Sequence, residues 1–132
     1  MEGDQQAGNG DSTSLAGASL AHFTRLGEGA FHRHLAGTHG VAVVLFTAPS
    51  CGSCRAWKRL LPLALDGIAD ALYEVDVSEA TGVAREYGLF HLPTLFLYRD
   101  GRFHAELQCE ARAAAVRAAI LALLAAPAQD EP

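Results

Sequence analysis

Two cysteines, Cys51 and Cys54, are separated only by Gly52 and Ser53, and this close spacing is the strongest chemical signal in the sequence. They follow the apolar run VAVVLF and stand where a helix is predicted to begin. Backbone N–H groups at a helix N-terminus favour an anion, so a thiol placed there ionises more easily and becomes a better nucleophile. The spacing predicts a redox couple in which Cys51 attacks a substrate disulfide and Cys54 then attacks Cys51, releasing the reduced substrate. Arg55, and more loosely Lys58, are expected to add positive potential nearby.

Two other interpretations of the cysteine pair stay open on spacing alone. Free cysteines are often buried, so the pair could be two packed thiols. A metal site would need two more ligands, for which Cys109 and the six histidines are candidates, but none of them has a second Cys-x-x-Cys spacing. We therefore predict neither a metal nor a bound cofactor.

Three side chains outside the pair have alternative interpretations. His91 either stabilises the Cys51 thiolate as a cation or is an exposed loop residue without a role. Cys109 is predicted to be a packed residue near the end of the last strand, with a regulatory thiol as the alternative. Trp57, three residues after Cys54, is predicted to pack near the first turn of the helix, with substrate contact as the second possibility.

The elements that must position the pair alternate between strand and helix. Apolar periodicity and turn residues predict strands over 20–26, 41–46, 72–77, 94–98 and 103–107, and helices over 28–37, 51–69, 78–88 and 111–126. Ser78 is expected to cap the third helix, which Gly82 interrupts and Gly88 ends, while Pro62 should kink or break the second helix. The order predicts an α/β fold with parallel crossovers and a terminal antiparallel hairpin, and therefore a mixed sheet.

Composition indicates one soluble domain with polar ends. We expect a flexible polar tail over residues 1–18, a domain over 19–126 and a polar C-terminal tail over 127–132. The chain has 132 residues, half of them apolar, and a formal charge of −5, which argues against nonspecific nucleic-acid binding. No apolar run is long enough to cross a membrane, and the first residues lack the features of a signal peptide. We expect a cytoplasmic monomer, a setting in which close cysteine pairs are more often catalytic or metal-binding than structural.

Two segments, VVLFTAPSCGSCR and YEVDVSEATGVAREYGLFHLPTLFLYRDGR, resemble the thioredoxin family. The resemblance covers about residues 20–126 and implies the thioredoxin fold, a central mixed sheet of about five strands flanked by about four helices. It implies that Pro93 is a cis-proline facing the cysteines, and that the backbone of Leu92 can pair with an extended substrate segment. It also implies protein disulfides as substrates and an NADPH-dependent thioredoxin reductase as electron source. The substrate groove would be formed by Ser50, Leu92, Pro93 and Thr94.

The sequence departs from the family pattern at four places. Ser50 stands where the family usually has the tryptophan of its docking surface. Gly52 and Ser53 replace the usual Gly-Pro between the cysteines, and the residues at these two positions tune the redox couple. Leu45 replaces a buried aspartate thought to take the proton of the resolving thiol, so Cys54 needs water or another group as its base. The family's helix-kinking proline would fall at Arg59, whereas the proline here is Pro62. These changes keep a second hypothesis open, a redox-inactive binding module, chaperone or assembly factor with the same fold.

Overall fold

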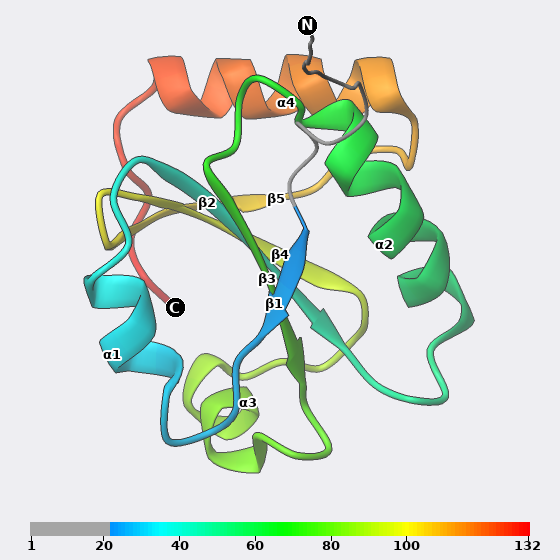
Figure 1. The fold of residues 1–132 in the computed structure, drawn as a ribbon, viewed down its shortest axis with the longest axis vertical. Coiled ribbons are helices and arrows are strands. Elements are labelled where there is room, and N and C mark those ends of the chain that lie inside the picture. The colour runs from blue at the N-terminus through cyan, green and yellow to red at the C-terminus, as the bar shows by residue number, and fades with distance from the viewer. Residues whose placement is uncertain (1–21) are drawn as a thin grey trace, which may run out of the picture.

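The computed structural model describes residues 22–132, so the predicted tail over 1–18 lies outside the described residues. Within 22–132, five strands and four helices follow one another in the predicted order. The strands are β1 (Phe23–Arg25), β2 (Val41–Thr47), β3 (Ala71–Asp76), β4 (Thr94–Arg99) and β5 (Arg102–Leu107). The helices are α1 (Phe31–Ala36), α2 (Gly52–Ala64), α3 (Thr81–Tyr87) and α4 (Ala113–Ala125) (Figure 1).

The five strands form one mixed sheet in the spatial order β1-β3-β2-β4-β5. β3 pairs in parallel with both β1 and β2, while β4 is antiparallel to β2 and to β5. Helices connect β1 to β2 and β2 to β3, and these three strands run in the same direction. β4 runs in the opposite direction to β2, and the Asp100-Gly101 turn then leads back into β5. Both turn residues have positive φ, 50° and 83°, which suits a tight hairpin. The predicted mixed sheet is confirmed.

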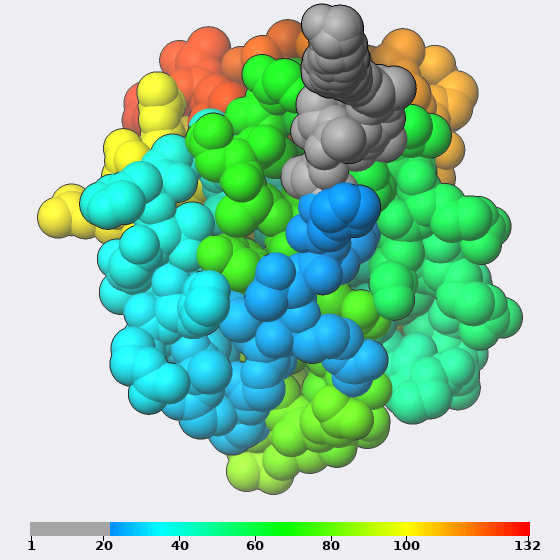
Figure 2. Space-filling view, in the orientation of Figure 1, coloured from blue at the N-terminus to red at the C-terminus, as the bar shows by residue number. Residues whose placement is uncertain are grey.

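Side chains from the two faces of the sheet form two separate apolar clusters. One cluster lies toward α1 and α3 and contains the aromatic rings of Phe31, Phe46 and Phe96. The other lies toward α2 and α4 and contains Leu45, Leu61, Leu97, Val116 and Ile120, among others. β2 contributes to both clusters because alternate side chains of a strand point to opposite faces, which explains its uninterrupted apolar sequence. Figure 2 shows β1 at the surface between α1 and α2.

The predicted helix over 51–69 is too long, because α2 ends at Ala64. Pro62 lies in the last turn of α2, where it removes one backbone hydrogen bond, and the helix continues through it to Ala64. Leu65 follows as the C-cap, and Gly67 then adopts a left-handed φ of 80° that no helix continues through. The helix therefore ends soon after the proline.

The prediction that Ser78 caps the third helix is wrong. α3 begins only at Thr81, after Ala80 as N-cap, and the Ser78 hydroxyl and N–H instead donate hydrogen bonds of 2.6 and 2.8 Å to Asp76. Glu28, far away in the sequence, supplies the first turn with an acceptor, because its carboxylate accepts a hydrogen bond of 2.9 Å from the Gly82 N–H. A Cβ atom at Gly82 would collide with that carboxylate, so the absence of a side chain at Gly82 leaves space for the Glu28 carboxylate beside the first turn of α3.

The residues after α4 return along the edge of the sheet, as the red end of the ribbon shows in Figure 1. The Gln129 N–H donates a hydrogen bond of 2.7 Å to the His104 carbonyl of β5, and the Gln129 side chain accepts one of 3.1 Å from the Glu106 N–H. The Tyr87 hydroxyl donates a hydrogen bond of 2.8 Å to Glu131. These contacts occupy part of the edge of β5 that no other strand pairs with.

Candidate functional site

Cys51 and Cys54 meet at the junction between β2 and α2, where they form a disulfide with a Cα–Cα distance of 5.4 Å. Cys51 is the N-cap of α2 and has extended backbone angles, and its sulfur accepts a hydrogen bond of 3.2 Å from the Cys54 N–H. A sulfur in this position receives the N–H groups that stabilise negative charge at a helix start. The two cysteines are unequal, since Cys51 is half-buried and only 2% of Cys54 is exposed.

The residues between and before the cysteines are exposed to solvent. Gly52 has open space around it, and the Ser53 hydroxyl lies 3.7 Å from the Cys51 sulfur. Ser50 lies in the exposed turn between β2 and α2 and carries no bulky side chain over the disulfide. The surface around the Cys51 sulfur is therefore open.

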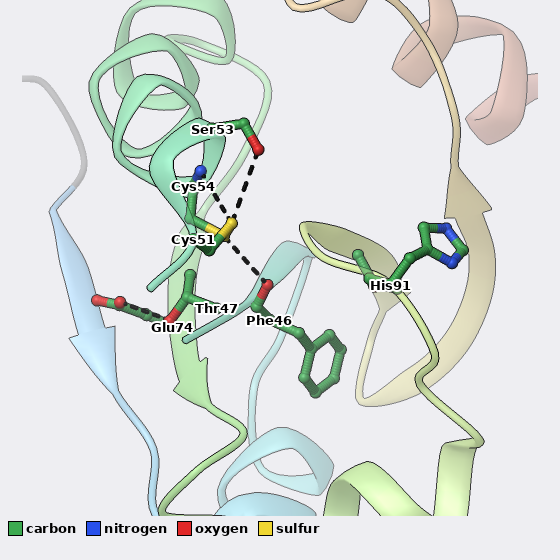
Figure 3. The surroundings of a disulfide bond; sticks show 8 residues. Phe46, Thr47, Cys51, Ser53, Cys54, Glu74 and His91 are labelled. Carbon is green, nitrogen blue, oxygen red and sulfur yellow. Dashed lines mark hydrogen bonds between the residues drawn. A yellow bond between two sulfur atoms is a disulfide. The ribbon is translucent and has the colours of Figure 1, made fainter. Parts of the chain in front are cut away.

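The loop before β4 contains the second predicted part of the site. The Leu92–Pro93 peptide bond is cis, and both residues are half-buried. Thr94 is buried, and its hydroxyl donates a hydrogen bond of 2.8 Å to the His91 carbonyl, which ties the two ends of the loop together. His91 is exposed and its ring points away from the two sulfur atoms (Figure 3). This orientation favours the interpretation of His91 as a loop residue without a role in the redox couple.

A cavity of about 240 Å³ opens beside the disulfide. Both cysteines line it, together with three cationic and two acidic side chains, Arg25, Arg55, Lys58, Glu74 and Asp76. Thr47, Ala48 and Pro49 complete the lining. Half of the residues that line the cavity are thus charged.

Glu74 is the functional candidate that the sequence did not reveal. Its side chain is only 7% exposed, forms an ion pair of 3.0 Å with Lys58 and accepts a hydrogen bond of 2.9 Å from the Thr47 hydroxyl. Figure 3 shows Glu74 and Thr47 beside each other near the start of α2. The sequence pattern of β3 could have indicated that Glu74 is buried. A strand between two parallel neighbours is covered on both faces, so the polar residues of its alternating pattern are buried as well.

The second acid of the cavity, Asp76, is firmly held as a carboxylate. The Ser78 hydroxyl and N–H, with help from the Arg25 guanidinium 3.5 Å away, hold the pKa of Asp76 below its usual range. Arg25 also forms an ion pair of 3.0 Å with Glu79.

Two other sequence candidates lie in the packing around α2 and α4. Trp57 is buried in the apolar cluster between these helices and the sheet, so it is a core residue. Cys109 follows β5, packs half-buried against the same cluster and is not part of a disulfide. Burial, and to a lesser degree the charge of Glu110, raises the pKa of the Cys109 thiol.

The described part of the chain contains neither a candidate metal cluster nor a helix that could span a membrane. Within residues 22–132, no cluster of three or more histidine, cysteine or acidic side chains has a geometry that could hold a metal ion. None of the helices in that range has both the length and the apolar character required to span a membrane.

A cysteine pair at the start of a helix on a mixed sheet, with a cis-proline loop before the neighbouring strand, defines a thiol–disulfide redox site. The profile of the thioredoxin family matches residues 22–122. The chain belongs to the thioredoxin family, and the predicted family and fold are confirmed.

Individual relatives are distant. Thioredoxin from Bacillus subtilis is 33% identical over 66 residues, which cover 48% of this chain and 64% of the relative. A protein disulfide isomerase-like 1-3 from Arabidopsis thaliana is 35% identical over 77 residues, 56% of this chain but only 13% of the plant protein. The chain thus spans a small part of some of the curated relatives that it matches.

Among solved structures, mitochondrial thioredoxin 3 from Saccharomyces cerevisiae, in its oxidised form, has a TM-score of 0.59 and 25% identity. That match covers 70% of this chain and 87% of the yeast protein. The zinc-bound form of human ERp44 has a TM-score of 0.66 with 23% identity, covering 76% of this chain and 31% of the human one. This second likeness concerns the fold.

Proposed function

We propose that this protein is a thiol–disulfide oxidoreductase that exchanges dithiol and disulfide reversibly with protein substrates. Cys51 is the nucleophile and Cys54 the resolving thiol. The observation that carries this assignment is the inequality of the two sulfurs: Cys51 is reachable and receives a helix N–H, whereas Cys54 is almost fully buried. A substrate can reach only the outer sulfur, and the inner one remains close enough to displace it.

The surroundings of Cys51 suit an extended protein segment. Ser50 leaves the surface before the cysteine open, and the backbone of Leu92 lies in the loop that Thr94 ties to the His91 carbonyl. A substrate strand could pair with the Leu92 backbone and present its disulfide to Cys51. We propose an NADPH-dependent reductase as electron source, while Gly52 and Ser53 tune the couple. The cytoplasmic location and the monomeric state stay predictions from the sequence.

Turnover of insulin disulfides, with dithiothreitol as the reductant, tests the assignment. Cys51→Ser should abolish turnover. Cys54→Ser, reduced and then mixed with insulin after removal of dithiothreitol, should accumulate a mixed disulfide that added dithiothreitol releases. Cys109→Ser serves as the matched control, because it removes a thiol that takes no part in the pair and should leave turnover unchanged. Turnover by Cys51→Ser at the wild-type rate would overturn the proposal.

Equilibration of the pair against glutathione buffers then separates the reductive from the oxidative direction. A reduction potential near −270 mV, roughly the value of thioredoxin, would indicate a reductant of cytosolic thiols. A value above about −200 mV would indicate an isomerase or oxidase. If the pair shows no reversible transition, the enzyme proposal fails and the binding-module hypothesis replaces it.

A further inference from the structure

We propose that Glu74 is the proton acceptor for Cys54 in the resolving step, acting through a water molecule in the charged cavity. This inference rests on the proposed function, because it assigns a role within the exchange between Cys51 and Cys54. It also gives Cys54 a base, which the chain otherwise lacks at Leu45, the position where the family has an aspartate.

The need for a base follows from the burial of Cys54. Only 2% of this residue is exposed, and burial disfavours the thiolate, which is the species that attacks a disulfide. Among residues 22–132, the Cys54 sulfur lies within hydrogen-bond reach of the Phe46 carbonyl, at 4.0 Å, and a carbonyl cannot take up the proton. A group that faces the same cavity and carries a basic oxygen must therefore assist.

The sheet register brings Glu74 to the required face. Glu74 of β3 pairs directly with Leu45 of β2, so both side chains project on the same side of the sheet, toward α2. The neighbouring strand thus presents a carboxylate about one strand spacing, roughly 4.8 Å, from the position where Leu45 lies. Glu74 and Cys54 both line the cavity of about 240 Å³, which contains charged side chains and is large enough for water.

The contacts of Glu74 fix the position of its carboxylate. Lys58 of α2 lies 3.0 Å from one oxygen, and the Thr47 hydroxyl of β2 donates to the other at 2.9 Å. The remaining charged groups around the cavity are Arg55 of α2, Arg25 of β1 and Asp76 of β3. Lys58 is 42% exposed, so it can move toward solvent while Glu74 receives a proton.

Asp76 is the weaker candidate although it lines the same cavity. Hydrogen bonds from Ser78 and the nearby Arg25 lower the pKa of Asp76, which makes its carboxylate a poorer base. They also direct both of its oxygens: Oδ1 accepts the bonds from Ser78, and Oδ2 faces Arg25 at 3.5 Å.

The resolving step moves one proton and exchanges one disulfide bond for another. The Cys54 S–H bond breaks, and its proton passes through water to the Glu74 carboxylate. The Cys54 thiolate attacks the Cys51 sulfur, so a Cys51–Cys54 bond forms while the bond between Cys51 and the substrate sulfur breaks. The substrate thiolate leaves with the electron pair and is the reduced product, the two cysteines are oxidised to the disulfide, and Glu74 returns its proton to solvent.

Stopped-flow mixing of the reduced protein with 4,4′-dithiodipyridine, a small neutral disulfide, separates the two steps. Attack by Cys51 releases the first thiopyridone, and attack by Cys54 on the resulting mixed disulfide releases the second. Glu74→Gln should slow the second release at pH 7 by about tenfold or more, because general bases typically contribute 10² to 10⁴ in rate, while changing the first by roughly threefold at most. If the first release does not depend on Cys51, the proposed function fails, which is a separate outcome from failure of this inference.

The pH profile distinguishes a proton acceptor from a merely structural residue. In Glu74→Gln the second rate should rise about tenfold per pH unit, since the thiolate now forms only by loss of a proton to solvent, and it should approach the wild-type rate at high pH. In the wild-type protein the second rate should be much flatter around neutral pH. Parallel profiles, or a second rate within twofold of wild type at pH 7, would overturn the inference.

Two variants control for charge and folding. Asp76→Asn removes the same charge from the same cavity and should leave the second release within about twofold of wild type; a loss as large as that of Glu74→Gln would indicate a general electrostatic effect and overturn the inference. Glu74→Asp retains a carboxylate and should recover part of the second rate relative to Glu74→Gln. If Glu74→Gln does not fold, the second release and its pH profile are compared between Glu74→Asp and wild type instead. A positioned base should lose rate when its carboxylate is moved back by one methylene group, so an unchanged second rate and pH profile in Glu74→Asp would overturn the inference.

Discussion

Replacing Lys58 with methionine should destabilise the fold more than replacing its partner Glu74 with glutamine. Only 7% of the Glu74 side chain is exposed, whereas 42% of Lys58 is, and the two are joined at 3.0 Å. Lys58→Met leaves a buried carboxylate with the Thr47 hydroxyl as its remaining hydrogen-bond donor. Glu74→Gln instead leaves an ammonium group that can turn to water and an amide that still accepts from Thr47.

The size of the difference follows from this asymmetry. Removing one partner of a buried charged hydrogen bond costs about 1–3 kcal/mol, and fully buried pairs cost roughly 3–5 kcal/mol. Because Lys58 is partly exposed, we take the lower range and expect a loss of about 2 kcal/mol for Lys58→Met. For Glu74→Gln we expect about 0.5 kcal/mol, in the range of exposed ion pairs.

Urea unfolding of the oxidised proteins at pH 7 measures both losses. With a typical slope of about 2 kcal/mol per M urea, the midpoint should fall by about 1 M for Lys58→Met and by about 0.25 M for Glu74→Gln. The double variant Lys58→Met/Glu74→Gln contains no unpaired buried charge and should be more stable than Lys58→Met alone. Equal losses for the two single variants, or a larger loss for Glu74→Gln, would show that the buried, unpaired carboxylate is not the cause of the destabilisation.

Two further perturbations test the packing that supports the site. Gly101→Ala should cost about 2 kcal/mol, because φ is +83° there and a Cβ would lie 2.7 Å from the Ala36 carbonyl oxygen; Gly27→Ala, with nothing within 4 Å, is the control, and equal unfolding midpoints would contradict this account. Burial raises the pKa of Tyr98 to about 12 and that of Tyr87 further above its usual value of 10. The folded state therefore favours the neutral phenols, so stability should be fully present below pH 10 and fall between pH 10 and 12 by about 1.4 kcal/mol per pH unit for each tyrosine. Tyr98→Phe should make this fall less steep, and a flat stability profile in the wild type would exclude the effect.

Much of the fold and the redox pair could be predicted from local patterns. The apolar run of β2, the alternation of β3 and the Asp100-Gly101 turn each encode their element within a few residues, so the order of strands and helices followed. The boundaries were less well determined. Where α3 begins depends on Glu28, a residue over 50 positions earlier that binds the Gly82 N–H, and no local rule contains that contact.

The chemistry of the Cys51 sulfur could be predicted from local sequence, because a helix that begins just after a buried strand places Cys51 at its N-cap. The group that can accept the proton of Cys54 could be identified only from the packing of the sheet. In the sequence, Glu74 is one polar residue of an alternating strand. In the structure, the register pairs it with Leu45, and α2 covers the face on which both side chains lie. Burial and the distance between strands are properties of the packed sheet. An acid that is absent from β2 at Leu45 can therefore be replaced in its role by an acid on the neighbouring strand β3.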